Sequence, residues 1–157
     1  MRPIWRWIFQ KRRDSSQCLW LSRERENAVP IKNIKKKEEI MLYIMDTANL
    51  DKIRHCVKYY PIDGVTTNPS IISKEHSDFP KLIKEIRSII GEERMLHIQV
   101  TGDSYEEIVR EATDLRDYVG GNLYIKVPIS KEGLKATSKL KEMGMKVTET
   151  AIFTPQQ

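Results

Sequence analysis

The sequence has little of several features that would identify a class of protein. Its two cysteines, Cys18 and Cys56, are too few for a disulfide framework, so we expect a reducing compartment, the cytoplasm. No run approaches the ~18 apolar residues of a membrane-spanning helix, so we expect no membrane partner. The three histidines and two cysteines lack the spacing of metal ligands, so we predict no metal site.

Residues 1–40 hold 11 of the 27 Lys and Arg residues but only 5 of the 22 Asp and Glu residues. The same segment holds all three tryptophans and none of the seven glycines. The positive net charge of the chain, +5, therefore comes from this segment and not from the rest of the chain. Because a basic terminal segment alone is no sign of a nucleic-acid-binding domain, we expect no nucleic-acid partner. Without a sustained hydrophobic period we expect disorder here, although a targeting or anionic-surface role is an alternative.

Met41 suggests another origin for this segment. A strand-like sequence follows Met41 directly, and Lys37-Glu38-Glu39 can be encoded by a purine-rich string that resembles a bacterial ribosome-binding site. We hypothesise that residues 1–40 are a translated leader and that the natural start is Met41, which the nucleotide sequence tests. The chain then divides into a basic N-terminal extension, 1–40, and a domain, 41–157.

Beyond residue 41 the hydrophobic period alternates between about 2 and about 3.6. The strand pattern occurs in five segments, 43–46, 64–67, 95–101, 123–128 and 146–152. The helix pattern occurs in four, 49–59, 78–90, 104–119 and 131–143. We expect Asn49 to cap the first helix, Gly144 to cap the last, and Phe79 and Leu134 to lie on buried sides.

Strands that alternate with helices through short loops predict an α/β fold with a parallel sheet. The sheet is either a doubly wound open sheet or part of a TIM (β/α)₈ barrel. No Gly-rich phosphate loop follows the first strand, which argues against a nucleotide-binding open sheet. A barrel needs eight strands and typically ~250 residues, so the barrel interpretation gives an incomplete barrel, with about the first five strands and four helices.

Alternation along the strands places polar side chains on one face of the sheet. Where Leu123, Ile125 and Val127 face the helices, Lys126 points the other way, inward. The same rule places His97, Gln99 and Thr101 inside, pairs Thr66 with Asn68, and pairs Thr148 with Thr150. Asp46 closes the first strand.

A lysine inside an apolar strand is unusual, because burial of an ammonium group is costly and favours the neutral amine. A neutral amine is a nucleophile that forms a Schiff base with a carbonyl substrate, and Asp46 is a candidate acid/base for it. Asn68 and the threonines are candidates to hold sugar hydroxyls and a water. The alternative is that Lys126 reaches solvent and pairs with Asp46 in a structural ion pair.

Five strings together resemble the transaldolase family, most closely its small branch, which includes fructose-6-phosphate aldolase. They are Asp46-Thr-Ala-Asn49, Gly64-Val-Thr-Thr-Asn-Pro-Ser70, Gln99-Val100, Lys126-Val-Pro with Glu132-Gly-Leu134, and Thr150-Ala-Ile-Phe153. The resemblance covers residues 41–157. It implies class I aldol chemistry on a sugar phosphate, without metal or cofactor, and a homo-oligomer for full-length members.

The resemblance also implies a role for each matching residue. Lys126 matches the Schiff-base lysine and Asp46 the acid/base aspartate. Asn68 and Thr66 match substrate-contacting positions, and Thr150 matches the threonine that positions the catalytic water. Gln99 matches the glutamine of the aldolase branch, which favours cleavage of fructose 6-phosphate over transfer of dihydroxyacetone units.

The chain ends just after the fifth predicted strand, whereas the family's later strands supply a phosphate-binding arginine and serine and an assisting tyrosine. Because five strands leave the sheet open, we expect Lys126 to meet water and its pKa to return toward ~10.4. Three interpretations follow: a truncated class I aldolase or transaldolase with impaired activity, a fragment that a second chain complements, or a non-catalytic interaction protein that uses the basic extension.

Overall fold

The computed structural model describes residues 7–10 and 41–156. Of the N-terminal extension only Trp7–Gln10 is described, as strand β1. The hypotheses on residues 1–6 and 11–40, including their origin as a translated leader, lie outside the described residues.

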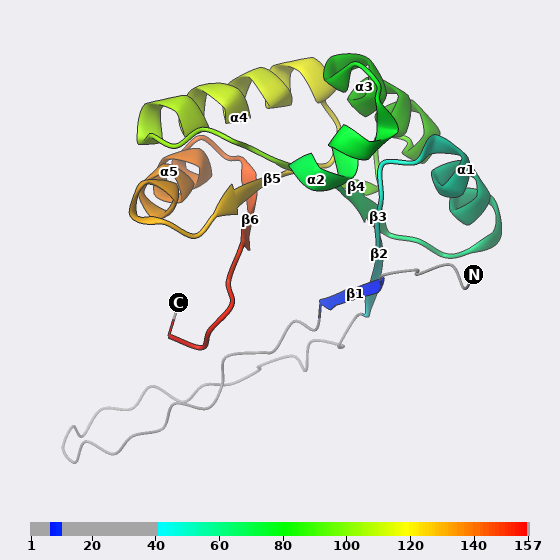
Figure 1. Ribbon diagram of the computed structural model, residues 1–157, viewed down its shortest axis with the longest axis horizontal. Coiled ribbons are helices and arrows are strands. Elements are labelled where there is room, and N and C mark those ends of the chain that lie inside the picture. Colours follow the sequence, from blue (N-terminus) through cyan, green and yellow to red (C-terminus); the bar gives the residue numbers. More distant parts are fainter. Residues whose placement is uncertain (1–6, 11–40, 157) are drawn as a thin grey trace, which may run out of the picture.

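The sheet is built from strands that lie side by side in chain order (Figure 1). Five of them are parallel: β2 (Leu42–Asp46), β3 (Gly64–Thr66), β4 (Met95–Gln99), β5 (Leu123–Pro128) and β6 (Lys146–Thr150). Strand β1 runs antiparallel along the outer edge of β2, with Trp7 opposite Met45. The predicted set of five parallel strands alternating with helices is confirmed, and it forms part of a barrel-like arrangement.

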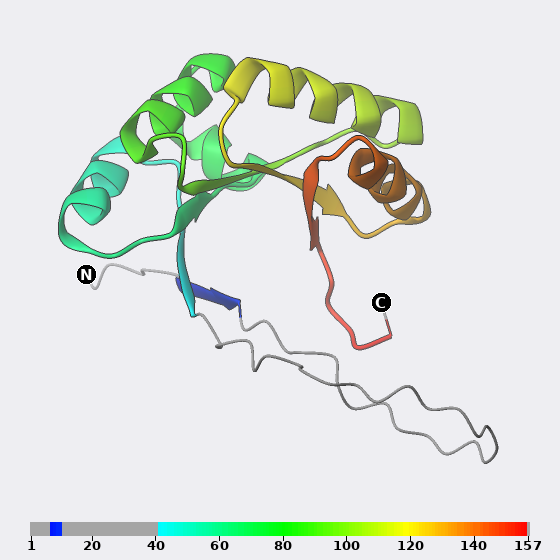
Figure 2. The same ribbon diagram turned by 180° about the vertical axis from the view of Figure 1, so that it is seen from behind.

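Four long helices lie on one side of the arched sheet and leave its concave side uncovered (Figures 1 and 2). They are α1 (Leu50–Tyr59), α3 (Phe79–Ile90), α4 (Tyr105–Val119) and α5 (Lys131–Glu142). Two short elements follow β3 where a turn was predicted, α2 (Pro69–Ile72) and the 3-10 helix η1 (Ser73–Glu75). Asn68 begins α2, because its side chain accepts a hydrogen bond from the Ile71 N–H at 3.0 Å and Pro69 suits the first helical position.

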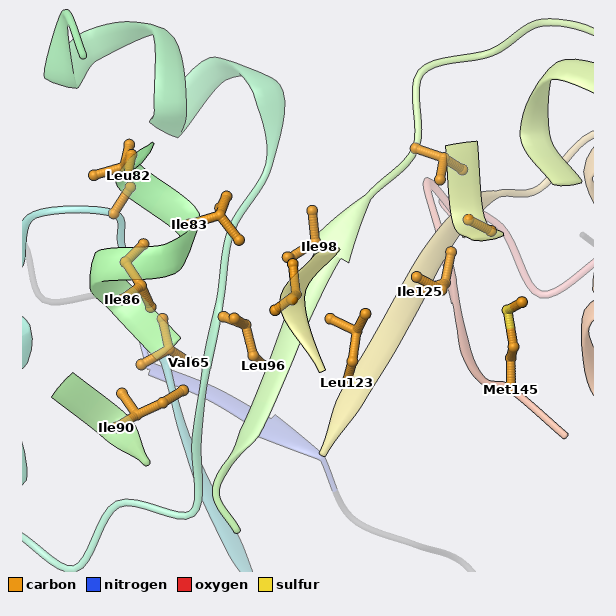
Figure 3. Close-up of a cluster of buried hydrophobic side chains, with 14 of the residues drawn as sticks. Val65, Leu82, Ile83, Ile86, Ile90, Leu96, Ile98, Leu123, Ile125 and Met145 are labelled. Atoms are coloured by element: carbon orange, nitrogen blue, oxygen red, sulfur yellow. The ribbon is translucent and has the colours of Figure 1, made fainter. Parts of the chain in front are cut away.

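The apolar core lies between the helices and the convex face of the sheet (Figure 3). Leu96, Ile98 and Ile125 of the strands and Ile83 and Ile86 of α3 all belong to this core. The predicted alternation along the strands is confirmed, since the residues assigned to the helix side are in this core.

Some details of the prediction are wrong. Leu134 is 50% exposed, because the buried stripe of α5 is Gly133, Ala136 and Leu140, one residue out of phase with it. Phe79, in the first turn of α3, is 37% exposed. Met143 is the C-cap residue of α5, and the predicted Gly144 follows it with a left-handed φ of 76°. Strand β6 ends at Thr150, before Ala151, which adopts a φ of 60°.

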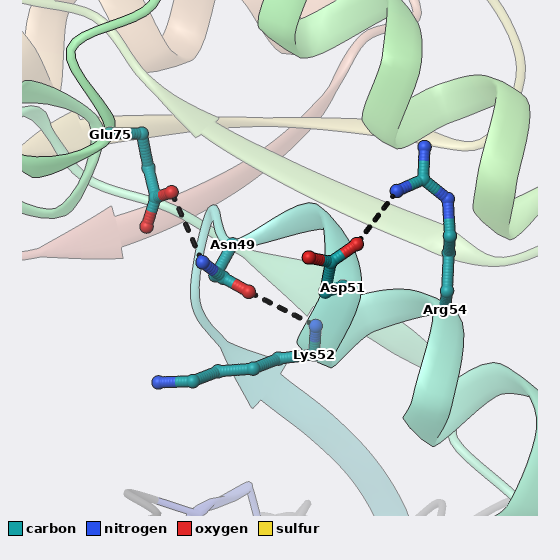
Figure 4. A network of polar contacts seen from close by, with 5 residues as sticks. All are labelled: Asn49, Asp51, Lys52, Arg54 and Glu75. Atoms are coloured by element: carbon teal, nitrogen blue, oxygen red, sulfur yellow. Dashed lines mark hydrogen bonds and ion pairs between the residues drawn. The ribbon is translucent and has the colours of Figure 1, made fainter.

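Helix α1 begins as the sequence predicts, at an asparagine cap (Figure 4). The Asn49 side-chain oxygen accepts a hydrogen bond from the Lys52 N–H at 3.1 Å, which satisfies a free donor of the first turn. The Asn49 amide also donates to Glu75 at 3.2 Å and so ties η1 to this helix. Within α1, Arg54 pairs with Asp51 at 3.1 Å. The contacts of Asn49 hold the short loop that connects α1 to β2, the strand that ends at Asp46.

Helix α5 approaches the end of β5 closely at Gly133. A Cβ atom at this position would overlap the carbonyl oxygen of Pro128 and lie 3.2 Å from a methyl group of Val127. Only glycine therefore allows the first turn of α5 to pack against the strand that carries Lys126. Among the described residues, no helix combines the length and the apolar character needed to cross a membrane.

Candidate functional site

The candidate site residues share the concave face of the sheet. Strand register aligns Asp46 with Thr66 and Thr66 with His97, and in the next row it aligns Gln99 with Lys126 and Lys126 with Thr148. Residues in register on adjacent parallel strands point to the same face. This face is opposite the apolar core, so its polar side chains do not interrupt the packing of the helices.

Lys126 lies at the centre of this face and is only 8% exposed. Its Nζ atom donates hydrogen bonds to the Thr67 carbonyl oxygen at 2.9 Å and to Thr66 Oγ1 at 3.2 Å. Thr66 is the last residue of β3 and Thr67 follows it, so the lysine side chain passes over β4. The expectation that an open sheet would leave Lys126 in water is therefore wrong, because the side chain folds back across the concave face.

Burial lowers the pKa of the Lys126 amine, and the negative charge of Asp46 opposes this with a smaller effect. The alternative in which Lys126 reaches solvent does not fit this geometry. A lysine with a lowered pKa has a larger fraction of neutral amine at a given pH, and the neutral form is the nucleophile. Asp46 lies close enough to influence that amine electrostatically, as an acid/base partner must.

A cavity of about 220 Å³ opens next to Lys126. Thr66, His97, Thr148 and Thr150 are among the residues that line it with Lys126. Two of the predicted site residues, Thr66 and Thr150, thus share a cavity with the lysine. The cavity offers hydroxyl groups, one imidazole and one amine, and Ile44 and Glu149 complete its lining. Such a lining suits a small polyhydroxylated carbonyl compound.

Two other predicted residues have different surroundings. Gln99 adjoins Lys126 in strand register but lines a separate cavity of about 820 Å³, whose walls come mainly from α2, α3 and α4. The Asn68 side-chain oxygen caps α2, as described above, and so already has a hydrogen-bond donor. The structure does not bring Gln99 and Asn68 into the lysine cavity, and their catalytic and binding roles stay predictions.

His97 also belongs to the site, although it was not among the predicted site residues. Its Nδ1 atom lies 3.0 Å from Thr148 Oγ1, and its ring stacks on Tyr124 with 4.5 Å between ring centroids. The side chain is 4% exposed and lines the cavity of Lys126. The period-two pattern of β4 already placed His97 inside, but nothing in the sequence indicated a contact with β6.

Burial, and to a smaller extent the positive charge of Lys126, together lower the pKa of His97 from 6.5 to about 4. Between these two values the unfolded chain binds a proton that the folded chain does not. The part of the free energy of unfolding that depends on His97 is therefore complete above pH 6.5 and is lost as the pH drops toward 4.

When the pH is lowered from about 7 to about 5, we expect protonation of this histidine in the unfolded chain to reduce the free energy of unfolding by about 2 kcal/mol. Urea unfolding at the two pH values measures the loss, and in His97→Phe the loss should be smaller by that amount. Equal losses in the wild-type chain and the variant would show that the folded state does not exclude the proton from His97.

The chemistry available here is that of an amine nucleophile among hydroxyl groups. Within residues 7–10 and 41–156, no group of three or more His, Cys, Asp or Glu side chains is arranged to hold a metal ion. A buried amine beside a carboxylate is suited to attack on a carbonyl carbon, with the carboxylate to move protons.

Comparison with known proteins gives a consistent picture. The family described as Transaldolase/Fructose-6-phosphate aldolase matches residues 43–157. A "Probable fructose-6-phosphate aldolase" of Streptococcus pneumoniae is 39% identical over 115 residues, 73% of this chain and 52% of that protein. A "Probable transaldolase" of Maridesulfovibrio salexigens is 42% identical over 117 residues, 74% of this chain and 53% of that protein. The chain spans about half the length of the curated relatives it matches.

Proposed function

The chain belongs to the transaldolase/fructose-6-phosphate aldolase family, and from this premise we propose that Lys126 forms a Schiff base with the ketone group of a sugar phosphate. The substrate class is fructose 6-phosphate or a compound that carries a dihydroxyacetone unit. One observation carries the proposal: Lys126 is buried in a hydroxyl-lined cavity where burial lowers its pKa.

The reaction begins when the neutral amine attacks the ketone carbon and gives a carbinolamine. Loss of water from this carbinolamine forms the iminium ion. A base then takes the proton of the hydroxyl group on C4, the bond between C3 and C4 breaks, and its electron pair moves into the iminium to give an enamine. The aldehyde leaves, and the enamine either takes a proton at carbon or attacks a second aldehyde. Water finally hydrolyses the iminium and frees Lys126.

We assign the proton transfers to Asp46, because its charge acts directly on the Lys126 amine. Thr150 is assigned to hold the water that enters and leaves the carbinolamine, since it lines the same cavity. Thr66, which lines the cavity, is assigned to a substrate hydroxyl, and Asn68 is assigned to another from the family resemblance alone. Gln99 favours cleavage over transfer, as in the aldolase branch that it resembles.

A second candidate function is that of a fragment completed by another chain. It is supported by the coverage of the relatives, of which this chain matches 52–53%. It is also supported by the position of β6, which ends the sheet in the described part of the chain and presents a parallel edge for a further strand. In this form the Schiff base forms on Lys126, but turnover requires residues of the second chain.

Borohydride reduction of the 157-residue chain with dihydroxyacetone or fructose 6-phosphate tests the proposal. Mass spectrometry should find one reduced adduct per chain, on the peptide that contains Lys126. Little or no aldol cleavage by this chain, together with an adduct, favours the complemented fragment. Cleavage that appears when the C-terminal half of the Streptococcus pneumoniae relative is added would support it directly. A folded chain without any adduct would contradict the enzymatic interpretation and leave the interaction protein.

A further inference from the structure

The contact between His97 and Thr148 crosses the sheet in an unusual way. His97 is on β4 and Thr148 is on β6, and β5 lies between them. The imidazole ring therefore extends over the concave face of β5, stacked on Tyr124, to reach the Thr148 hydroxyl at 3.0 Å. Thr148 in turn is in register with Lys126, so the contact ends beside the lysine.

We propose that His97 is a positioning residue of the lysine cavity, whose Nδ1 atom holds the Thr148 hydroxyl group toward the hydroxyl groups of a ketone bound at Lys126. The inference rests on the proposed function and adds to it a determinant of substrate preference, for ketones that carry hydroxyl groups next to the carbonyl. Both side chains line the cavity with Lys126.

The hydrogen-bond chemistry of His97 and Thr148 supports a bond that the imidazole donates and the threonine hydroxyl accepts. A neutral imidazole carries one N–H, and when it is on Nδ1 it donates to Thr148 Oγ1. The hydroxyl proton of Thr148 is then available to donate to an oxygen atom in the cavity. The ring has little freedom to move away, because it is buried, stacked on Tyr124 and bound at Nδ1. Thr148 itself is half-buried, so a ligand in the cavity can reach it.

A comparison of two ketones separates this positioning role from a general structural one. The readout is the half-saturating ketone concentration for borohydride trapping at Lys126, measured with dihydroxyacetone and with acetone, which has no hydroxyl group. His97→Phe keeps the aromatic stack but loses the hydrogen bond. We expect it to raise the half-saturating dihydroxyacetone concentration about 3- to 10-fold, the effect of one hydrogen bond, and to leave that of acetone unchanged.

Four further variants complete the test. His97→Asn, whose amide N–H can replace Nδ1–H, should restore much of the affinity for dihydroxyacetone. Thr148→Val should match His97→Phe, and the double variant should be no worse than either single one, because all three remove the same contact. Thr148→Ser keeps the hydroxyl and should bind like the wild-type chain.

The outcomes distinguish this inference from the proposed function. If wild-type Lys126 is trapped by both ketones but His97→Phe shifts neither or shifts both equally, the positioning role is overturned and the Schiff-base proposal stands. Additive losses in the double variant would also overturn it, since His97 would then act independently of Thr148. If the wild-type chain is trapped by neither ketone, the proposed function fails and the inference fails with it.

Discussion

Lys126→Met is expected to abolish the reduced ketone adduct completely while it leaves the chain folded. Methionine has a similar length and no amine, so it cannot form a Schiff base. The free energy of unfolding should stay within about 1 kcal/mol of the wild-type value, because relief from burial of the amine offsets two lost hydrogen bonds. Intact mass after borohydride reduction and urea unfolding measure the two effects.

Lys146→Met is the matched control for this substitution. Lys146 lies on β6, on the strand next to Lys126, but it is exposed and donates to the Asn122 side chain at 2.7 Å. This variant should form as much adduct as the wild-type chain. Adduct that persists in Lys126→Met, or is lost equally in both variants, would show that the reactive amine is not the buried one.

Gly133→Ala should destabilise the chain by about 1–3 kcal/mol, the usual cost of an overpacked contact. The sign is the informative part, because alanine in place of glycine in a helix normally stabilises by about 0.5–1 kcal/mol. Here the new Cβ would overlap the Pro128 carbonyl oxygen and lie 3.1 Å from Ser130 Oγ. The first turn of α5 must therefore move away from the end of β5.

Two measurements check this expectation. Urea unfolding gives the loss of stability, and Lys141→Ala, on the exposed surface of the same helix, should change it by less than about 0.5 kcal/mol. Adduct formation at Lys126 should also decrease in Gly133→Ala, since Pro128 lies two residues from the lysine on β5. A variant more stable than the wild-type chain would show that α5 does not pack this closely.

The elements of the fold were predictable because each depends on local chemistry. Period-two alternation on β5 separates Ile125 and Val127 from Lys126, and this separation is confirmed by the composition of the core. The cap at Asn49 follows from its position before an amphipathic helix. The short helix α2 was missed because Asn68-Pro69 is typical of a turn as well as of a helix start.

The site was predictable only in outline. Strand alternation placed Lys126 and His97 on the inner face, but it does not predict which neighbouring strands a long side chain contacts. Lys126 bends back over β4 to β3, and His97 reaches over β5 to β6. These contacts depend on the curvature of the sheet and keep the lysine buried although the sheet is open. The same limit explains why Gln99, in register with Lys126, lines another cavity.

The state of the Lys126 amine is the central claim, and an NMR titration measures it most directly. The ε-methylene resonance of Lys126, assigned by its loss in Lys126→Met, can be followed against pH in the folded chain. We predict a midpoint below the ordinary lysine value of 10.5, because burial disfavours the ammonium form. A midpoint at or above 10.5 would contradict the account, because Lys126 would then be an ordinary ammonium group.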